Sequence, residues 1–463
     1  MKNLGIILTL LLITACASRP DYNPPRLTST PSQWTNASSE TDKAQTIAQE
    51  GWLPGIADTY LTGLVTEALN NNHSVSAQVA AVQQADQQRV ISGAPRLPEL
   101  NAAIDATRRK TQSGGIESIN SSFSGSLNLS WEIDIWGKLS ATQQQASLNL
   151  AAQQARLQRI RQQLVADVCN AWFDVVEAQN LLTLYTNRLK NLRGNLAIIE
   201  SGYNKGINTA LDVFLARNNV DQESARTEAQ HLKLTEAEQN LLLLLGRYPD
   251  AGTFPHKDLP ILDSDVPAGL PSELIDRRPD IRGNWLDLMA ADAGVAIAHR
   301  QRFPSLSLTG SIGQSSTELK NLLNGNQSVW SISGGFLQPL FNAGALAARE
   351  AQARGKLKQM EQEYLDGVLQ AFAEVETALI GEQSLKLQYQ RFTDAERSAL
   401  AAEELSFEQY QRGLVTYTTV LEAERRAVDA QSSVVQLKRQ RLRNRINLFL
   451  ALGGDFSEST AEQ

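Results

Sequence analysis

One stretch, residues 123–199, constrains this sequence most, because a strand-like pattern passes almost directly into a very long helix-like pattern. In residues 123–135, apolar residues alternate with Ser, Asn, Glu and Asp, as in a strand with one apolar and one polar face. In residues 182–199 the apolar positions recur every three or four residues, which is a heptad pattern. No Pro interrupts residues 139–201, so we expect one helix of about 60 residues, roughly 90 Å long.

The composition argues against several classes of protein. Long stretches dominated by Ala, Gln, Leu, Arg and Glu, with only 15 Pro and 6% aromatic residues, favour long helices over a large aromatic core. The net charge is -7, and the basic residues are spread along the chain, so nucleic acid is not an expected partner. Four scattered His and the interior Cys169 show no metal-binding spacing, and no catalytic motif is present, so we expect neither an enzyme nor a cofactor.

The N-terminus has the pattern of an export signal. Lys2 precedes an apolar run too short to span a bilayer, and Ile13-Thr14-Ala15-Cys16 follows. We expect residues 1–15 to be a lipoprotein signal peptide and Cys16 to be lipidated; an ordinary signal peptide is the alternative. The Pro-, Ser- and Thr-rich residues 16–50 then form an extended segment between the lipid and the folded body.

The chain contains an internal duplication. Arg96-Leu97-Pro98 matches Arg302-Phe303-Pro304 at an offset of 206 residues, and Leu245-Gly246 matches Leu452-Gly453 at 207. We therefore divide the chain into a first repeat, a linker, a second repeat and a disordered tail, at residues 51–250, 251–270, 271–454 and 455–463.

Each repeat is predicted to contain a helix, two strands and two long helices. The strands are expected near 99–107 and 123–136 in the first repeat and near 305–313 and 328–340 in the second, with residues 108–122 as a polar loop. The long helices are expected at 139–201, 209–245, 344–408 and 416–450.

Four alternating strands suggest a membrane barrel shared between chains. Single-chain bacterial barrels begin at eight strands, and open sheet edges are not tolerated in lipid. Two copies would supply about eight strands and three copies about twelve. The alternative is a soluble sheet that caps a helical bundle. Glu132 and Asp134 fall on the polar face, where we expect them to line a pore rather than act as a catalytic pair.

Several motifs resemble those of the TolC-like outer membrane factors, in the lipoprotein branch that serves multidrug efflux of the RND type. They are the Cys16 box with residues 18–22, and the stretches 129–138, 277–281 and 338–344, together with two Tyr-x-x-Gly turns. The resemblance covers about Cys16 to Gly454. It implies a homotrimer in which a twelve-stranded membrane β-barrel continues into a long α-helical coiled-coil barrel.

The same resemblance implies location and partners. The protein would be lipid-anchored and barrel-inserted in the outer membrane, with a tunnel through the periplasm. It would be the passive exit duct of a tripartite efflux system for drugs or other small toxic compounds. A periplasmic adaptor (membrane fusion) protein and an inner-membrane pump would complete that system.

The turns between the long helices are expected at the inner end of the tunnel. Gly206 and Gly413 can adopt the left-handed conformation that ends a helix, and Thr209 with Asp212 matches a capping box. By resemblance, the adaptor docks on residues of these two tips: Tyr203, Lys205, Gly206, Thr209, Tyr410, Arg412, Gly413 and Thr416.

By resemblance, the periplasmic gate lies close to the tips, at Thr419, Glu422, Asp212 and Tyr417. Thr419 stands where some members of the family carry Asp, so only Glu422 would contribute a ring of carboxylates in the trimer. The alternative is that Thr419-x-x-Glu422 is a capping box and that Glu422 pairs with Arg425 or Arg426.

Two other functions remain open on the residues. The chain could be the outer membrane component of a type I protein secretion system. In a different class, it could be a non-conducting coiled-coil lipoprotein that acts as a spacer, although a spacer does not need four alternating strands.

Overall fold

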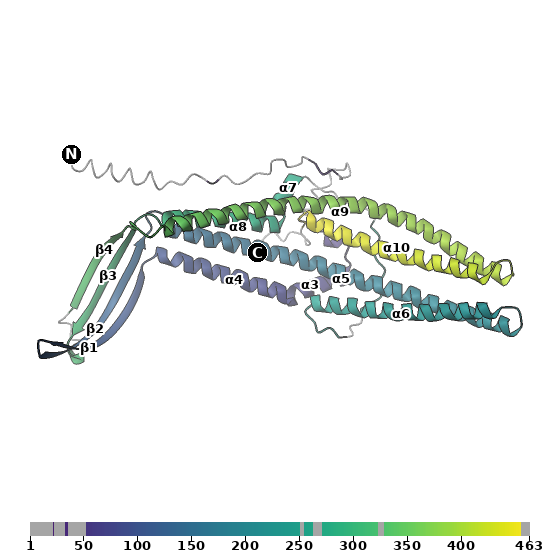
Figure 1. Ribbon diagram of the computed structural model, residues 1–463, viewed down its shortest axis with the longest axis horizontal. Coiled ribbons are helices and arrows are strands. Elements are labelled where there is room, and N and C mark those ends of the chain that lie inside the picture. The colour runs from purple at the N-terminus through teal and green to yellow at the C-terminus, as the bar shows by residue number, and fades with distance from the viewer. Residues whose placement is uncertain are drawn as a thin grey trace. The chain divides into compact units, whose positions relative to one another are not determined.

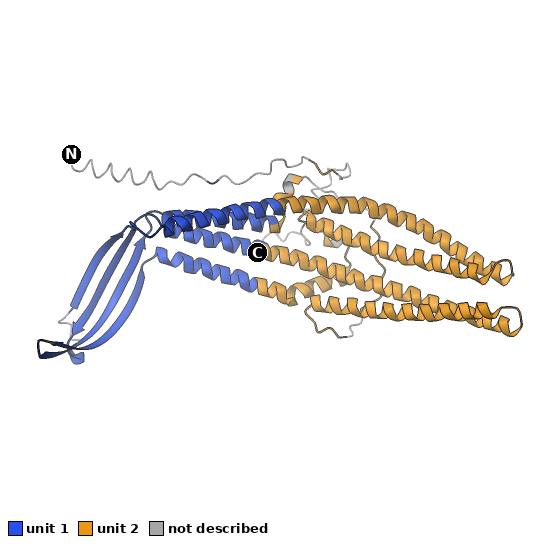
Figure 2. Ribbon diagram, in the orientation of Figure 1, with its two compact units in different colours: residues 1–27, 79–155, 281–367 blue, residues 28–78, 156–280, 368–463 orange. Residues whose placement is uncertain are grey.

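The computed structural model describes residues 22, 33–35, 52–250, 254–262, 271–322 and 328–454. Cys16 and the predicted signal peptide, most of the N-terminal segment and the tail lie outside the described residues. The chain divides into two compact units (Figure 2). Unit 1 comprises residues 1–27, 79–155 and 281–367, and unit 2 comprises residues 28–78, 156–280 and 368–463.

The helices follow the order expected for a duplicated unit (Figure 1). The first repeat contains α3 (Thr59–Asn71), α4 (His73–Gly93), α5 (Lys138–Asn204) and α6 (Ala210–Leu244). The second contains α7 (Pro271–Arg277), α8 (Pro279–Arg300), α9 (Ala345–Gln411) and α10 (Tyr417–Ala451). Short 3-10 turns lie at Leu53–Gly55, Ala94–Arg96 and Leu319–Asn321. Both α5 and α9 run for 67 residues without interruption.

Four antiparallel strands form one sheet in the order β1-β2-β3-β4. They are β1 (Glu99–Ser113), β2 (Ile116–Ile133), β3 (Ser305–Ser316) and β4 (Ser328–Leu337). The register sorts side chains into rows across the sheet. One row is Ala102, Leu127, Ile312 and Trp330, and the neighbouring row is Asn101, Asn128, Ser311 and Ser331. Since neighbouring residues of a strand point to opposite faces, the sheet has one apolar and one polar face.

The prediction of a loop at residues 108–122 is wrong. The strands β1 and β2 continue pairing to Ser113 and Ile116 and turn through Gly114 and Gly115, both with positive φ, as two-residue hairpin turns require. Lys110 Nζ lies 2.7 Å from Glu117 Oε1 across this extension. Side chains here are exposed on both faces, so no apolar alternation marks the strands in the sequence.

The junction between β2 and α5 also differs from expectation. The strand ends at Ile133, three residues before the predicted end. Asp134 accepts hydrogen bonds from the Leu139 N–H at 2.9 Å and the Ser140 N–H at 2.8 Å, and so satisfies donors at the start of α5. Glu132 accepts from Lys138 Nζ at 2.5 Å. Both carboxylates therefore contact the start of α5, and the expectation that they also line a pore stays a prediction.

The duplication extends to the contacts that close the last helix of each repeat. Asn72, between α3 and α4, donates a 3.0 Å hydrogen bond to the carbonyl of Leu244 at the end of α6. Arg278, between α7 and α8, donates from Nη1 to the carbonyl of Ala451 at the end of α10, at 3.3 Å. Equivalent positions thus satisfy terminal helix carbonyls in both repeats.

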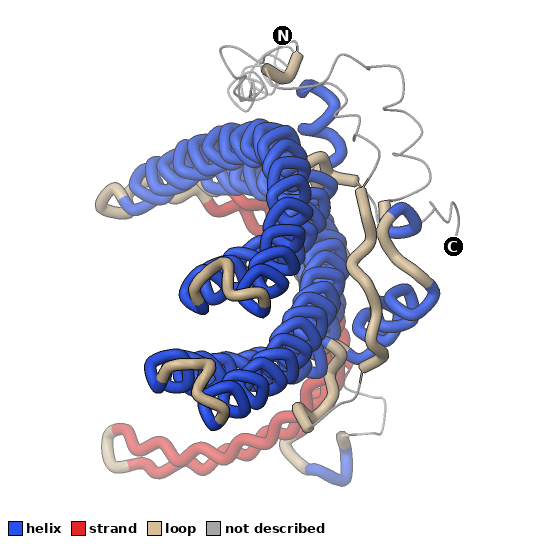
Figure 3. The backbone as a smooth tube through the Cα atoms, turned by 90° about the vertical axis from the view of Figure 1, so that its right-hand side faces the viewer, coloured by secondary structure: helices blue, strands red, loops and turns tan. Residues whose placement is uncertain are grey.

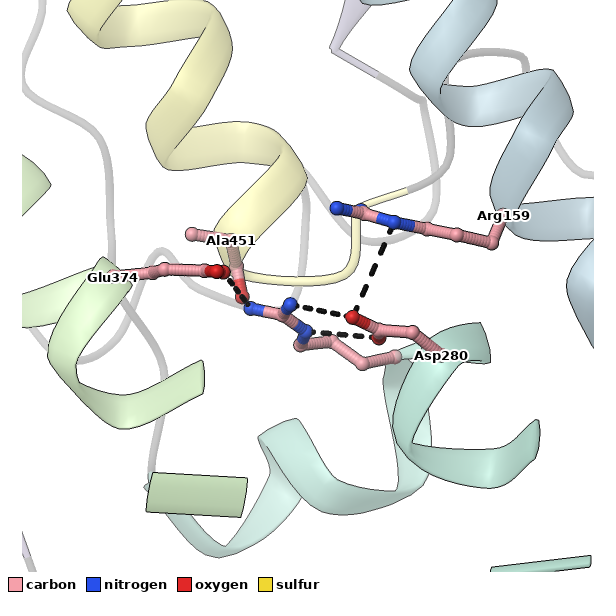
Figure 4. A network of polar contacts seen from close by, with 5 residues as sticks. Arg159, Asp280, Glu374 and Ala451 are labelled. Atoms are coloured by element: carbon pink, nitrogen blue, oxygen red, sulfur yellow. Dashed lines mark hydrogen bonds and ion pairs between the residues drawn. The ribbon is translucent and has the colours of Figure 1, made fainter. Parts of the chain in front are cut away.

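The contact in the second repeat is part of a larger polar network (Figure 4). Arg278 is 3% exposed and makes two hydrogen bonds to the Asp280 carboxylate, at 3.0 and 2.6 Å. It also donates to Glu374 Oε2 at 2.6 Å. Arg159 Nε lies 4.0 Å from Asp280 Oδ2. The buried guanidinium of Arg278 thus joins α8, α9 and α10, and Asp280 connects it to Arg159 on α5.

The core of unit 2 lies between two helical hairpins, α5–α6 and α9–α10. In Figure 3 the turns of both hairpins, drawn in tan, face the viewer. Contacts join α6 to α5, α5 to α10 and α10 to α9: Gln230 to Ala178, Arg439 to Asp174, and Asn444 to Ala378. Cys169 is fully buried in this core, and burial raises the pKa of its thiol to about 12, as suits a packing residue.

Candidate functional site: the helix tips and the residues behind them

The two tips have the same backbone construction. In the first, the Gly206 N–H donates to the Tyr203 carbonyl and the Ile207 N–H donates to the Gly202 carbonyl, both at 2.9 Å. In the second, Gly413 donates to Tyr410 at 2.9 Å and Leu414 to Gln409 at 3.0 Å. Gly206 and Gly413 have φ of 74° and 71°. Each long helix therefore ends in a Schellman-type turn closed by a left-handed glycine.

The tips differ at the start of the following helix. Thr209 and Asp212 form the predicted capping box at α6: the Asp212 N–H donates to Thr209 Oγ1 at 3.2 Å, and the Thr209 N–H donates to Asp212 Oδ2 at 3.0 Å. At the equivalent position of α10, Thr416 is the N-cap but makes no side-chain cap hydrogen bond. Its hydroxyl instead lies 2.7 Å from Thr418 Oγ1 and 3.3 Å from Thr419 Oγ1.

Most of the expected docking residues are exposed at the tips, and Tyr203 is 49% exposed. Tyr410 and Gly413 of the second tip and Lys205 and Thr209 of the first line a cavity of about 810 Å³ between the two tips. Each tip also exposes one apolar side chain: Ile207 is 77% exposed and Leu414 is 69% exposed. The tips thus combine exposed apolar, basic and hydroxyl side chains on rigid turns.

The tyrosines near the tips do not share one environment. Tyr417 is 1% exposed and belongs to an apolar cluster to which all four long helices contribute. The other buried members are Ile199, Val213, Ala216 and Val420. The Tyr417 ring lies 5.4 Å from that of Tyr410, which packs against the same cluster. Burial raises the pKa of both phenols, and the charge of Asp212 adds to the shift at each. Tyr410 and Tyr417 are therefore neutral packing residues behind the tips.

The Glu422 carboxylate forms ion pairs with two arginines of the same helix. Its Oε1 accepts a 2.8 Å hydrogen bond from Arg426 Nε, and Arg425 Nη2 lies 3.0 Å from its Oε2. Hydrogen bonds from Arg426 and then Arg425 lower the pKa of this carboxyl. The expected pairing with these arginines is confirmed. The capping box at Thr419 is wrong, since α10 begins at Tyr417 and Thr419 lies inside its first turn.

A buried charged cluster behind the tips was missed by sequence reasoning. It consists of Arg188 on α5, Glu223 on α6, Glu403 on α9 and Glu424 on α10. Each of these residues alone is ordinary on a helix rich in charged side chains. The only signal was indirect, because Arg188 sits next to the apolar seam that includes Tyr185, Leu189 and Leu192.

The described residues contain neither a candidate membrane-spanning helix nor a candidate metal cluster. Within residues 52–250, 254–262, 271–322 and 328–454, no helix is both long and apolar enough to cross a membrane. In those same ranges no three His, Cys, Asp or Glu side chains cluster in a way that could hold a metal ion.

Solved structures define the class of protein. Over 94% of this chain and 99% of the other, the fold matches CusC, a protein that forms a transmembrane channel, with a TM-score of 0.85 and 28% identity. It also matches the open state of the Neisseria gonorrhoeae MtrE outer membrane channel, with a TM-score of 0.86 and 25% identity over 96% of this chain and 99% of that one. The four-stranded sheet and paired helical hairpins are thus those of an outer membrane channel.

The sequence comparisons give the family. The model of the outer membrane efflux protein family matches residues 64–247 and 270–454, one match per repeat, so the chain belongs to that family. It is 31% identical to the pyoverdine export outer membrane protein OpmQ of Pseudomonas aeruginosa, over 98% of this chain and 97% of that protein. The protein is therefore an outer membrane efflux channel of the TolC-like type, an exit duct in the outer membrane.

Proposed function

We propose that three copies of this chain close one continuous duct, with a twelve-stranded barrel in the membrane and a helical barrel in the periplasm. The observation that carries the proposal is that the single chain has open edges. Within the sheet, β1 and β4 each pair on one side only. Because unpaired strand edges are not tolerated in lipid, a sheet with one apolar face must close against other copies.

The helices of unit 2 have open edges as well. On α6, Phe214, Leu232 and Leu243 are 66%, 60% and 59% exposed and recur after 18 and 11 residues, close to whole numbers of helical turns. On α9, four residues spaced by 11, 7 and 18 residues, again close to whole numbers of helical turns, are 52–55% exposed: Leu369, Ile380, Leu387 and Leu405. Since α6 and α9 are the two outer helices of the series α6-α5-α10-α9, these apolar stripes can meet between neighbouring copies.

The duct is passive in this proposal and belongs to a tripartite efflux system. A periplasmic adaptor docks at the exposed tips, and an inner-membrane pump supplies the energy and selects the cargo. The relatives differ in cargo by name, pyoverdine for OpmQ and cations for CusC. Lipidation of Cys16 anchors the N-terminus in the same membrane, and the chain carries out no catalysis.

The gate of this duct is proposed at Thr419 and Glu422, with Asp212 and Tyr417 behind them. An open state solved for the relative MtrE supports a gate that changes conformation. In a trimer, each Glu422 would bring Arg425 and Arg426 with it. The ring is therefore of mixed charge, and its preference for cations depends on the balance of these side chains.

The test is planar-bilayer conductance of the purified protein with wild type, Glu422→Gln and Arg425→Gln. We expect small openings in wild type, lower cation selectivity in Glu422→Gln and higher cation selectivity in Arg425→Gln, because the two substitutions change the ring charge in opposite directions. Arg397→Gln, an exposed arginine on α9 that pairs with Asp394, is the matched control and should leave selectivity unchanged.

The outcomes separate the parts of the proposal. Conducting pores with the same selectivity in all variants would remove Glu422 from the gate and keep the duct. A folded oligomer that does not insert into bilayers would contradict the duct itself.

A further inference from the structure

The buried charged cluster behind the tips joins the two hairpins of unit 2. Arg188 on α5 donates a 2.6 Å hydrogen bond from Nη1 to the backbone carbonyl of Glu424 on α10, and its Nε lies 3.3 Å from Glu223 Oε2 on α6. Asn195, also on α5, donates to Glu424 Oε1 at 2.9 Å. The contact between hairpins at this level therefore includes the Arg188 guanidinium, which binds the backbone carbonyl of Glu424, and the Asn195 amide, which binds its carboxyl.

The cluster contains more acid than base. Glu223 and Glu424 are each 5% exposed, and Glu403 on α9 is half-buried close to Glu424. Arg188 is the cation that all three carboxyls face; Arg226 reaches only Glu223, at 4.0 Å. The remaining titratable groups that act on this cluster are Tyr417 and Asp429, both on α10, and neither supplies positive charge.

Two carboxylate oxygens of the cluster lack hydrogen-bond partners among the described residues. They are Glu424 Oε2 and Glu223 Oε1, and both are buried. An ionised carboxylate in that position has lost its water without full compensation, whereas a protonated carboxyl costs much less to bury. Burial raises the pKa of Glu424 to about 7; Arg188 opposes the shift and Glu403 adds to it.

Protons and water can reach the cluster. A cavity of about 300 Å³ between α5, α6 and α10 is lined by Arg188, Glu223, Arg226, Glu422 and Arg425, among others. The walls of this cavity include Arg188 and Glu223, which together connect Glu424 to α6. The cavity therefore opens onto Arg188 and Glu223, the side of the cluster through which a proton can reach the buried Glu424.

We propose that Arg188, Glu223, Glu403 and Glu424 form a proton-operated latch between the hairpins α5–α6 and α9–α10. With Glu424 protonated, the two hairpins stay packed together behind the tips. Loss of the proton adds a third carboxylate around one buried cation, and repulsion together with hydration of the new charge separates the hairpins. The consequence for opening of the duct rests on the proposed function, but the hairpin movement itself does not.

The test measures the distance between the tips as a function of pH. Spin labels are placed on the full-length protein at the exposed positions Lys205 and Gln411 after Cys169→Ser, and one labelled chain is assembled with excess unlabelled chain. We expect a short, narrow distance distribution at pH 5.5 and a longer, broader one at pH 8.5. Glu424→Gln, which keeps the shape and the acceptor for Asn195, should give the short distribution at both pH values.

Two further variants sharpen the test. Glu403→Gln removes a like charge near Glu424, so the wild-type transition should move to lower pH by about one unit. Glu404→Gln, exposed and next in sequence to Glu403, should leave the transition where it is in wild type.

A wild-type distance that does not change with pH would overturn the latch. So would a Glu424→Gln variant that switches like wild type, or a transition that Glu403→Gln leaves in place. Absence of bilayer conductance in the same preparations would contradict the proposed duct and would not bear on the distances.

Discussion

At the scale of single residues, a glycine follows the last helix of each repeat, where the chain packs against the segment before α4 or α8. Gly246 and Gly453 follow the last helix of each repeat with φ of 73° and 71°. A Cβ on Gly246 would lie 2.7 Å from the carbonyl oxygen of Asn71, and one on Gly453 would lie 3.0 Å from the carbonyl carbon of Arg277. These positions need glycine for two reasons, the left-handed backbone and the close approach of a second backbone segment.

Replacing each glycine by Ala should therefore separate the cost of the left-handed backbone from the cost of the close approach. Gly413 at the second tip has the same left-handed φ, but a Cβ there would meet nothing within 4 Å. We expect Gly413→Ala to cost about 1 kcal/mol through backbone strain alone. Gly246→Ala and Gly453→Ala should cost about 2–3 kcal/mol, because the backbone must also shift. Chemical denaturation of the detergent-solubilised protein measures this, and equal losses at all three sites would contradict the close-approach argument.

At the scale of elements, polar groups rather than apolar contacts orient the first turns of the long helices. Asp134 satisfies N–H groups at the start of α5. Near the start of α9, Glu350 is 7% exposed and accepts hydrogen bonds from Arg302 Nη1 at 2.8 Å and Arg354 Nη2 at 2.7 Å. His299 Nδ1 on α8 lies 3.3 Å from the same carboxyl. Charged contacts thus connect each strand-bearing segment to its long helix.

The Glu350 contacts predict a pH dependence of stability. Burial alone would raise the pKa of Glu350, but hydrogen bonds from Arg302, Arg354 and His299 together lower it to about 2. The stabilisation is therefore complete above the ordinary pKa of about 4.5 and is lost as the pH falls toward 2.

Glu350→Gln tests this dependence. The variant should unfold at a lower temperature than wild type at pH 7, and the difference should shrink at pH 3. Glu318→Gln, which removes an exposed pair with Lys320, is the control and should change little at either pH. A difference that stays constant between pH 7 and pH 3 would show that Glu350 acts by packing and not by its charge.

At the scale of the whole molecule, the single chain leaves apolar side chains of α6 and α9 exposed. The exposed stripes on α6 and α9 are aligned along each helix, unlike isolated surface apolar residues, which need no explanation. If three copies pack through these stripes, as proposed, a substitution in a stripe should weaken the trimer without destabilising the fold of the single chain.

A charge in either stripe should dissociate the trimer without unfolding the chain. We expect Phe214→Asp and Leu387→Asp to raise the fraction of monomer by tenfold or more, about 1.4 kcal/mol, because each places a carboxylate in an apolar contact. Leu414→Asp at the second tip is equally exposed in the single chain and should leave the trimer intact. Native mass spectrometry gives the oligomeric state, and circular dichroism checks the helix content.

Local sequence patterns were enough to predict most helices and strands of this protein and their duplication. Apolar alternation places strands wherever one face is buried or meets lipid, and heptad spacing places long helices, because both depend on local periodicity. The long helices begin and end within three residues of the expected positions. The left-handed glycines and the Thr209–Asp212 capping box are local chemistry as well, and they were predictable for the same reason.

Which charged residues are buried, and which partners they bind, depends on how the helices and strands pack together. The hairpin extension at residues 108–122, the role of Asp134 and the cluster around Arg188 depend on partners distant in sequence or on exposure of both strand faces. Glu424 and Glu422 are two residues apart on one helix, yet one is buried among carboxylates and the other pairs with exposed arginines. Periodicity cannot distinguish them, because desolvation depends on which helices pack together.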